Sequence, residues 1–338
     1  MTADNLQIIS ALPDGALLIA ASGEVLAANQ SATDILQTPA HGLAASSVIR
    51  TPAFAEALAH AVKSRQTVNL EAEFRGRPPR QVSIHIAPIG DGEELLVLLR
   101  DLTREQAVEK MRSDFVANAS HEMRTPLTSI LGGIETLKGL ARNDAKAQEQ
   151  FLDMMLGQVH RMKRLIDDLL TLSRIELNEH VRPNSKVRIA EIARQAKANL
   201  SAAATAAGVS VDLTGASDFD VAGDPDELLQ VAQNLVENAI KYGSSGGRIE
   251  IDCSVSGANG NLLVRDFGKG IAEHHIPRLT ERFYRVSAQE SRSRGGTGLG
   301  LAIVKHIVLR HRGKLAIESA LGSGSTFAVS IPLFETKG

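Results

Sequence analysis

Cysteine is nearly absent from this chain of 338 residues, which contains only Cys253. A single cysteine cannot form a disulfide within its own chain, so we expect a reducing compartment and a fold without covalent cross-links. The residues at positions 249–253 alternate between apolar and polar types, as they do in a half-buried strand. We therefore interpret Cys253 as a strand residue and not as a reactive thiol.

Aromatic residues are also scarce. They make up 3% of the chain, and tryptophan is absent, which leaves little material for the platforms on which nucleic-acid bases stack. The 37 basic and 39 acidic residues give a formal net charge of -2. No basic cluster of the kind that binds a phosphodiester backbone stands out. We expect no nucleic-acid partner.

Long apolar runs are missing as well. The longest, such as 16–21 (ALLIAA), fall far below the ~18 residues that cross a bilayer. The first five residues do not combine a charged segment with an apolar one, as a signal peptide does. The sequence predicts no membrane segment within this chain and a cytoplasmic location. The alternative is that the chain is the cytoplasmic portion of an inner-membrane protein whose anchor precedes Met1.

The first 100 residues combine turn signals with short alternating segments. A turn at 12–15 (LPDG) precedes two segments that we expect to pair as a hairpin, 16–20 and 24–29. Short helices are predicted at 31–36 and 52–63, and antiparallel strands at 66–74, 80–87 and 93–99. This order, opening with LPDG and reaching Ala28-Asn29, resembles a PAS domain over residues 1–100.

The PAS resemblance leaves several roles open. PAS domains bind haem, flavin or a small molecule, or only dimerise. The flavin-photoadduct type needs a cysteine, which this segment lacks, while His60 and His85 are candidate haem ligands. Because a lone histidine in such a module is more often ordinary structure, we expect a dimerising or signal-transmitting sensor without a cofactor.

Reactive side chains are concentrated at 120–126 (SHEMRTP). Apolar residues around them recur at helical spacing and form one stripe: Val116, Met123, Leu127, Ile130, Ile134 and Leu137. His121 lies two residues before Met123, about 200° around a helix, so we expect its imidazole to point to solvent. Pro126 cannot donate a backbone N–H, which frees the carbonyl of Glu122 and predicts a bend just past the histidine.

The residue types at this position suit phosphoryl transfer. A neutral imidazole is a good nucleophile, and a neighbouring carboxylate can accept its second proton as charge builds up. An exposed histidine beside a glutamate is the plain alternative. The string 114–127 (DFVANASHEMRTPL) resembles the phospho-acceptor box of sensor histidine kinases, with Met123 in place of the usual leucine. The resemblance implies that His121 accepts the phosphoryl group, that Glu122 relieves its charge, and that Thr125 positions a water in a reverse phosphatase reaction.

Two long helices are predicted around this box. The first ends near 140–144, and the second begins around Ala147 and ends before Pro183. The second helix carries its apolar repeat at these positions: Phe151, Met154, Gln158, Met162, Leu165, Leu169 and Leu172. Such a hairpin at 111–182 cannot bury its apolar faces alone, so we predict a homodimer built on an antiparallel four-helix bundle. Heptad spacing of Val108, Met111 and Phe115 predicts a coiled-coil linker at 101–118.

Residues 183–336 alternate between helical and strand periodicity, which predicts an α/β sandwich. We expect a strand at 187–189, a helix at 190–206 and a strand at 209–213. Asp224 and Pro225 have the residue types of an N-cap and a first helical position. On the helix that follows, Asn234 and Asn238 are one turn apart and offer amide oxygens to Mg²⁺ and phosphates, although two solvated asparagines are the plain alternative.

Further motifs follow in order. A strand at 262–266 runs into Asp-x-Gly-x-Gly at 266–270, and the glycine-rich string 295–301 opens a helix whose amides suit phosphates. With the segments 281–286 (ERFYRV) and 322–327 (GSGSTF), these motifs resemble the N, G1, F and G2 boxes and the final glycine box of the GHKL ATPases. The resemblance implies bound ATP and Mg²⁺, the metal on Asn234 and Asn238. It also implies a mobile ATP lid at 287–294, from which Arg285, Arg292 or Arg294 reaches phosphates.

The residues that the resemblance assigns to ATP are Asn234, Asn238, Lys241, Tyr242, Asp266, Gly268, Gly270, Ile271, Phe283, Arg285, Gly296, Thr297, Gly298, Leu299, Gly300 and Thr326, the last beside the adenine-binding aspartate. As a whole the chain resembles the cytoplasmic part of a phosphate-regulon-type sensor histidine kinase. That family autophosphorylates a histidine and transfers the phosphoryl group to a receiver domain of a response regulator. The alternatives are a phosphatase-dominant sensor, a GHKL conformational ATPase and a non-enzymatic PAS adaptor.

Overall fold

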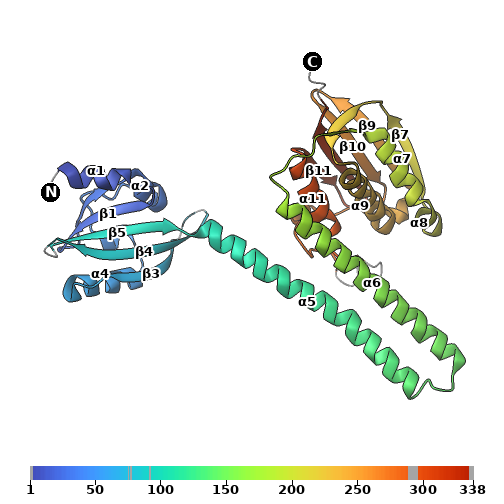
Figure 1. The fold of residues 1–338 in the computed structure, drawn as a ribbon, viewed down its shortest axis with the longest axis horizontal. Helices are drawn as coiled ribbons and strands as arrows, with labels where there is room; N and C mark the ends of the chain where they lie inside the picture. Colours follow the sequence, from blue (N-terminus) through green and yellow to red (C-terminus); the bar gives the residue numbers. More distant parts are fainter. Residues whose placement is uncertain (1–2, 75, 77, 91–92, 288–295, 335–338) are drawn as a thin grey trace. The chain divides into compact units, whose positions relative to one another are not determined.

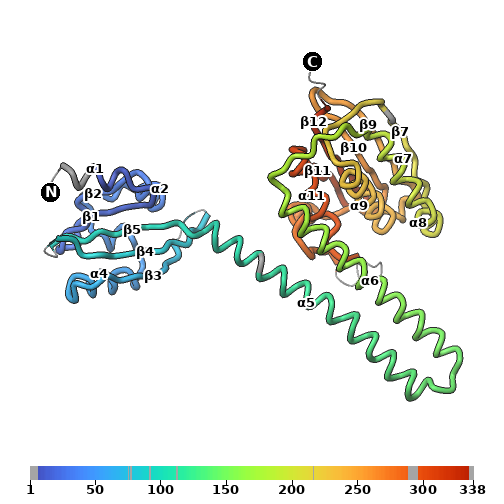
Figure 2. The backbone as a smooth tube through the Cα atoms, viewed as in Figure 1, coloured from blue at the N-terminus to red at the C-terminus, as the bar shows by residue number. Residues whose placement is uncertain are grey.

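The computed structural model describes residues 3–74, 76, 78–90, 93–287 and 296–334 (Figures 1 and 2). The chain divides into two compact units, Met1–Ala117 and Asn118–Gly338. Helix α5, Thr103–Lys138, begins in the first unit and ends in the second. Each unit has a hydrophobic core of its own.

The first unit is built on a five-stranded antiparallel sheet with the order β2-β1-β5-β4-β3. The strands are β1 Gly15–Ala20, β2 Val25–Ala28, β3 Val68–Phe74, β4 Arg80–Ile89 and β5 Glu94–Asp101, and the helices are α1 Ala3–Ala11, α2 Gln30–Leu36, α3 Ala45–Val48 and α4 Pro52–Ser64. The predicted hairpin, two helices and three later strands are confirmed. The sequence patterns do not predict α1 and α3, because α3 is a single turn and α1 is defined by the sheet face on which it packs.

The two faces of this sheet carry separate apolar clusters, because side chains alternate along β1. Leu17 and Ile19 face the helices α2 to α4 and pack with Phe54, whereas Leu18 faces α1 and packs with Ile9. Each large side chain that is fully buried contributes roughly 1.5–3 kcal/mol. The antiparallel α/β sensor fold is therefore held by apolar contacts on both sides of the sheet.

The two histidines considered as haem ligands lie on the surface of this unit. His60 is exposed on α4. His85 alternates along β4 with the buried residues Ile84 and Ile86, and its Nδ1 lies 2.6 Å from the Oδ1 of Asn69. Neither imidazole belongs to the apolar cluster around Phe54.

Asn29 connects several segments of the sensor unit through its side chain. Its Oδ1 accepts hydrogen bonds from the backbone N–H groups of Ala16 at 2.9 Å and Ala32 at 2.8 Å, the latter as the N-cap of α2. Its Nδ2 donates to the carbonyls of Ile9 and Leu12 at 3.2 Å and of Asp14 at 2.9 Å. The side chain is 5% exposed, so these bonds lie in the interior and tie α1, β1 and α2 together.

The second unit begins with a helical hairpin. Helix α5 continues through Pro126 to Lys138, and α6 spans Ala145–Leu177. Asp144 is the N-cap of α6 and accepts a hydrogen bond from the N–H of Ala147 at 3.0 Å, which sets the start of α6 two residues before the predicted one. Among the described residues, no helix combines the length and the apolar character needed to cross a membrane.

The rest of the second unit is an α/β sandwich, as predicted. A mixed sheet has the order β11-β12-β10-β9-β7, with β7 parallel to β9 and the other pairs antiparallel, and β6 and β8 form a small second sheet. The strands are β6 Ser185–Arg188, β7 Ser210–Ala216, β8 Asp220–Gly223, β9 Arg248–Ser256, β10 Asn259–Asp266, β11 Lys314–Ser319 and β12 Ser325–Pro332. The helices are α7 Ile189–Asn199, α8 Ser201–Ala206, α9 Pro225–Gly243 and α11 Gly300–Arg310, with short 3₁₀ turns η1 Ser244–Gly246 and η2 Glu273–Arg278.

Two local predictions differ from the structure here. The single helix predicted at 190–206 is two helices that meet at Leu200, which closes α7 and opens α8. The strand predicted at 187–189 is β6, which ends at Arg188 because Ile189 already belongs to α7. Cys253 is a buried residue of β9, as predicted.

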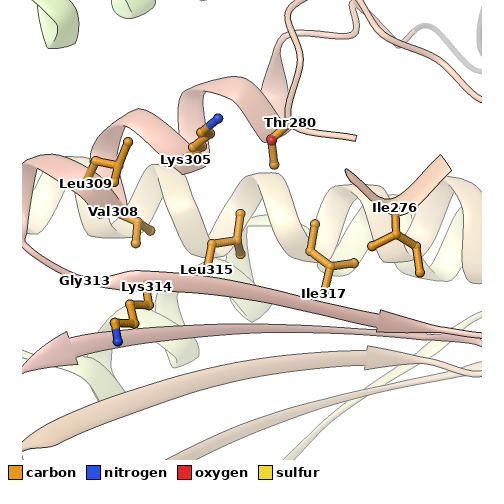
Figure 3. A pocket seen from close by; sticks show the side chains of 9 residues that line it. All are labelled: Ile276, Thr280, Lys305, Val308, Leu309, Gly313, Lys314, Leu315 and Ile317. Carbon is orange, nitrogen blue, oxygen red and sulfur yellow. The ribbon is translucent and has the colours of Figure 1, made fainter. Parts of the chain in front are cut away.

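Helix α9 lies between α7 and α11 and packs on β9 and β10 (Figure 1). Its buried face includes the four predicted residues, Leu228, Val231, Leu235 and Ala239. A pocket of about 460 Å³ is lined by residues of α11, β11 and η2. Figure 3 shows its lining side chains, among them the apolar Ile276, Val308 and Leu315. That pocket contains none of the predicted ATP-binding residues.

Candidate active site

A different pocket, of about 370 Å³, lies between α9, the segment after β10 and the start of α11. Most of the predicted ATP-binding residues line it: Asn234, Asn238, Lys241, Tyr242, Asp266, Gly270, Ile271, Arg285, Gly296, Thr297, Gly298 and Gly300. Gly268, Phe283, Leu299 and Thr326 are not among its lining residues. The structure therefore brings together side chains that lie far apart in the sequence.

Asp266 forms the polar end of the pocket at the terminus of β10. It is 5% exposed, and its Oδ1 accepts a hydrogen bond from the N–H of Gly268 at 2.9 Å. Burial raises the pKa of this carboxyl group, while hydrogen bonds from Gly268 and Ser325 oppose the rise. A buried carboxylate with a remaining acceptor position can receive a hydrogen bond from an exocyclic amine such as that of adenine.

The partner of Asp266 on β12 is Ser325 and not Thr326, which corrects the expectation for Thr326. Asp266 pairs with Ser325 in the antiparallel register, and Thr326 pairs with Arg265. Successive side chains of a strand point to opposite faces of the sheet, so only one of the two can face the pocket. Ser325 lines the pocket.

Helix α9 supplies the two asparagines. Asp224 caps it and accepts hydrogen bonds from the N–H groups of Asp226 and Glu227 at 3.0 and 3.1 Å, as the sequence predicts. Asn234 and Asn238 line the pocket one turn apart. The Nδ2 of Asn234 is buried and has no hydrogen-bond partner among the described residues, so this amide retains hydrogen-bonding capacity toward the pocket.

The glycine-rich segment before α11 forms the other wall. Gly298 has φ of 77°, and a side chain there would come within 2.9 Å of the backbone of Phe283. Phe283 itself has φ of 63°, and its N–H donates to the carbonyl of Gly298 at 2.9 Å. The buried Leu299 donates its N–H to the Oγ1 of Thr297 at 3.3 Å. These contacts fix the loop that opens α11. The first N–H groups of a helix have no partner within the helix itself, so those of α11 suit phosphate oxygens.

His121 is exposed on α5, as predicted, and Thr125 donates a hydrogen bond from its hydroxyl to the carbonyl of His121 at 3.3 Å. The carboxylate of Glu122 lies between two guanidinium groups. Arg161 of α6 contacts its Oε2 at 3.0 Å, and Arg285 contacts the same oxygen at 2.9 Å. These side chains are 19%, 11% and 7% exposed, respectively, so the ion pairs are largely shielded from solvent.

Arg285 also reaches the glycine-rich loop. Its Nη2 donates to the carbonyl of Thr297 at 2.9 Å. On the other side of Thr297, the hydroxyl donates to the Oδ2 of Asp168 on α6 at 2.7 Å. Burial raises the pKa of Asp168, and its hydrogen bond from Thr297 opposes that rise. Arg292 and Arg294, the other arginines considered for phosphate contact, lie outside the described residues.

Comparisons with known proteins identify the domains and the family of this chain. Residues 223–335 match the family of histidine kinase-, DNA gyrase B- and HSP90-like ATPases, residues 111–178 match the His kinase A (phospho-acceptor) domain, and residues 9–107 match the PAS fold. The phosphate regulon sensor protein PhoR of Pseudomonas aeruginosa is 36% identical over 321 residues, which are 94% of this chain and 72% of that protein. The chain belongs to the sensor histidine kinases.

A further relative of this sensor histidine kinase and one solved structure agree with that assignment, and a second solved structure shows the same fold. Sensor protein SrrB of Staphylococcus aureus is 30% identical over 96% of this chain, and the chain spans 55% of its length. The structure of the Acinetobacter baumannii histidine kinase AdeS is 27% identical, with a TM-score of 0.50 over 64% of this chain and 98% of that one. The histidine kinase ThkA, solved in complex with response regulator protein TrrA, shares the fold at 18% identity, with a TM-score of 0.52 over 96% of this chain and 97% of that one.

The sensor histidine kinase therefore contains a PAS domain, a phospho-acceptor hairpin and an ATP-binding domain. It is a protein histidine kinase that autophosphorylates with ATP and transfers the phosphoryl group to a response regulator. The phospho-acceptor domain decides against a GHKL conformational ATPase and a PAS adaptor, because neither has a role for that hairpin.

Among the residues of this kinase's site that were not identified from the sequence, Arg161 and Asp168 make the contacts described above. They lie seven residues apart on α6, which is two turns, so they share one face of the helix. That spacing was the available signal, but their partners Glu122 and Thr297 lie 39 and 129 residues away. The pairing of Arg161 with Glu122 is revealed only by the packing of α6 against α5, and that of Asp168 with Thr297 only by the packing of α6 against the ATP-binding domain.

The same helix is attached to α11 near its C-terminal end (Figure 1). Arg282 donates to Glu176 of α6 at 2.5 Å, and the Nε2 of His306 lies 3.6 Å from the same carboxylate oxygen. Arg310 donates from Nε to the carbonyl of Val181 at 3.0 Å and forms an ion pair with Glu227. The contacts of Glu176 hold the end of α6 against Arg282 and α11, and the contacts of Arg310 join α11 to the segment after α6 and to α9.

Proposed function

We propose that His121 is the phosphorylated residue of this kinase and that the pocket around Asp266 holds the ATP. A ring nitrogen of His121 attacks the γ-phosphorus, the bond to the bridging oxygen breaks, and ADP leaves. Glu122 accepts the proton from the other ring nitrogen as positive charge builds up on the imidazole. Because the transition state of phosphoryl transfer is loose, positioning and charge neutralisation supply most of the catalysis.

One observation carries this proposal: Arg285 contacts both Glu122 and the carbonyl of Thr297. Arg285 thus connects Glu122, which follows the proposed nucleophile His121, to the glycine-rich loop proposed to bind phosphates. A guanidinium at that position also favours negative charge on a transferring phosphoryl group. This contact between the hairpin and the ATP-binding domain supports the proposal, because it lies beside the proposed nucleophile.

We propose that Mg²⁺ binds with the nucleotide at Asn234 and Asn238. Their amide oxygens are the hard ligands that Mg²⁺ prefers, and phosphate oxygens and waters complete such a site. The buried amide of Asn234, which has no hydrogen-bond partner in the part of the chain that the structure describes, supports this assignment, since ligation by its oxygen would orient the amide. When bound, the ion neutralises phosphate charge.

We propose that the kinase is a homodimer through its helical hairpin. A set of large apolar side chains on α5 and α6 is exposed in the single chain: Leu127, Leu131, Ile134, Leu152, Leu156, Val159, Ile166 and Leu170. Pairing two hairpins as a four-helix bundle would bury this surface. The exposed Val108 and Met111 of α5 fit a coiled-coil linker that continues the same contact.

We propose that the receiver domain of the response regulator approaches the exposed face of α5 around His121, and that Thr125 positions a water for the reverse phosphatase reaction. The hydroxyl of Thr125 is one turn from the histidine and exposed, so water can reach it. We place these reactions in the cytoplasm because ATP and reduced thiols such as that of Cys253 belong to that compartment.

The test is autophosphorylation with ATP labelled in the γ-phosphate. We expect an acid-labile, base-stable phosphoprotein that is lost in His121→Ala. The matched control is His160→Ala, which removes an exposed histidine from the other helix of the hairpin and should leave labelling intact. Labelling that persists in His121→Ala, or its absence in protein shown to bind ATP, would refute the assignment.

Two further measurements separate the remaining proposals. Thr125→Ala should keep autophosphorylation but slow the loss of phosphate from a phosphorylated receiver domain, tested on a panel of purified receivers. Equal effects on both reactions would contradict the water-positioning role. Light scattering after size exclusion should report a dimer at micromolar concentration, and a stable monomer would contradict the four-helix bundle.

A further inference from the structure

Helix α6 forms one wall of the nucleotide pocket. Arg164, Asp167 and Asp168 line the pocket together with residues of α9 and the glycine-rich loop. Their spacing of three and four residues places Arg164 and both aspartates on one side of the helix. The hairpin therefore contributes charge directly to the site where the phosphates of a nucleotide are expected.

Within this wall, Asp168 occupies a hydrogen-bonding position of the glycine-rich loop. Its Oδ2 accepts the hydrogen bond of the Thr297 hydroxyl at 2.7 Å. The same hydroxyl accepts the N–H of Leu299, so it belongs to the backbone structure that opens α11. In nucleotide-binding sites, a phosphate oxygen occupies such a position at the start of a helix, and here the carboxylate of Asp168 occupies it.

We infer that the carboxylate of Asp168 competes with a nucleotide phosphate for the hydroxyl of Thr297, which makes Asp168 a specificity-determining residue of the kinase. The inference rests on the proposed nucleotide site. The carboxylate and a phosphate are both anions, so they cannot share one donor without repulsion. The binding free energy of a nucleotide must then include the displacement of Asp168 or its repulsion.

Among the described residues, charges of both signs act on Asp168. Glu237 adds negative charge near Asp168, while Lys241 and Arg164 add positive charge. Lys241 also forms an ion pair with Glu237 at 2.7 Å, so its positive charge is partly neutralised and attracts Asp168 less. Burial raises the pKa of Asp168, in agreement with a carboxylate that lacks full compensation.

The expected signature is a dependence on phosphate charge. Repulsion from Asp168 grows with the number of phosphates, so it penalises a triphosphate more than a diphosphate and leaves adenosine almost unaffected. Asp168→Asn removes the charge but keeps an oxygen that can accept the hydrogen bond from Thr297. The substitution therefore separates the charge of residue 168 from its role in packing α6 against the loop.

The experiment is calorimetric titration of the full chain, in excess Mg²⁺ at constant ionic strength, with a non-hydrolysable ATP analogue, ADP and adenosine. For two charges at the separations of such a pocket, we expect Asp168→Asn to tighten the triphosphate by about tenfold and ADP by about threefold, with adenosine unchanged. Asp167→Asn is the matched control, because it removes the same charge from the adjacent pocket-lining residue, which has a higher exposure. Its effect should stay below about threefold for every ligand.

Every other outcome would overturn either the role of Asp168 or the proposed function. An equal gain for all three ligands would mean that the substitution only loosens α6, and no change or weaker triphosphate binding would mean that Asp168 does not compete. A gain of the same size in Asp167→Asn would assign the effect to the general field of α6 and overturn the role of the Thr297 contact. If the wild-type protein bound neither nucleotide, the proposed function itself would fail; nucleotide binding without the graded response would overturn only this inference.

Discussion

Replacing Asn29 with alanine should selectively unfold the sensor unit. The substitution removes the five hydrogen bonds that the side chain makes to Ala16, Ala32, Ile9, Leu12 and Asp14. It removes the N-cap of α2 at a cost of about 1 kcal/mol. It also leaves the buried N–H of Ala16 without its acceptor, which costs roughly 1–3 kcal/mol.

The lost N-cap and the unpaired N–H of Ala16 together cost about 3 kcal/mol of unfolding free energy. The carbonyls of Ile9 and Leu12 add little to this cost, because they depend only partly on Asn29. The carbonyl of Ile9 also accepts the N–H of Leu12 at 3.3 Å, and both bonds from Asn29 to these carbonyls are long. A loss of that size raises the population of the open sensor unit roughly a hundredfold. Since the chain forms two compact units, the second should keep its stability.

Hydrogen exchange read by mass spectrometry on the full chain measures this directly. Amides of β1 and β5 should exchange roughly a hundredfold faster in Asn29→Ala, while those of β9 and β10 are unchanged. Asn69→Ala is the control, because this asparagine makes an exposed hydrogen bond to His85 and should change exchange little. An acceleration below tenfold, or an equal acceleration in β9 and β10, would refute the reasoning.

Three further predictions concern the second unit. Burial lowers the pKa of His311, so the unfolded chain binds a proton at higher pH than the folded chain does. The free energy of unfolding, measured by urea denaturation at each pH, should therefore fall as the pH drops below about 6.5. This dependence on pH should be absent in His311→Gln. Burial raises the pKa of the Cys253 thiol to about 11, so iodoacetamide should alkylate it only after denaturation, and rapid labelling of native protein would contradict this. Gly298→Ala should weaken ATP binding at least tenfold in calorimetry, since φ of 77° costs a side chain roughly 1–2 kcal/mol and its Cβ would meet Phe283. Gly257→Ala, with φ of 59° and open space around it, should leave ATP binding unchanged.

Elements with strong local signals could be predicted from the sequence. The cap at Asp224 and the apolar spacing of α9 led to the correct helix start and buried face. The alternation around Cys253 led to a strand of the correct burial. These signals are local because helices and strands repeat every 3.6 and 2 residues, so neighbouring residues contain the information. Helix α1 has no such pattern, and its position depends on the sheet face that it covers.

At the active site, too, only residues within local patterns could be predicted from the sequence. His121, Glu122, the asparagines and the glycine-rich segment could be found from the sequence because each belongs to a short motif with its own chemistry. The neighbours of these motifs could not. Strand register placed Ser325 instead of Thr326 beside Asp266.

Arg161 and Asp168 gained their roles only when α6 came to lie against residues 39 and 129 positions away. Which distant side chains meet depends on how the helices and the sheet pack, and no repeat along the chain encodes that contact. The sequence by itself determined which groups react, and the tertiary structure decided which charges surround them.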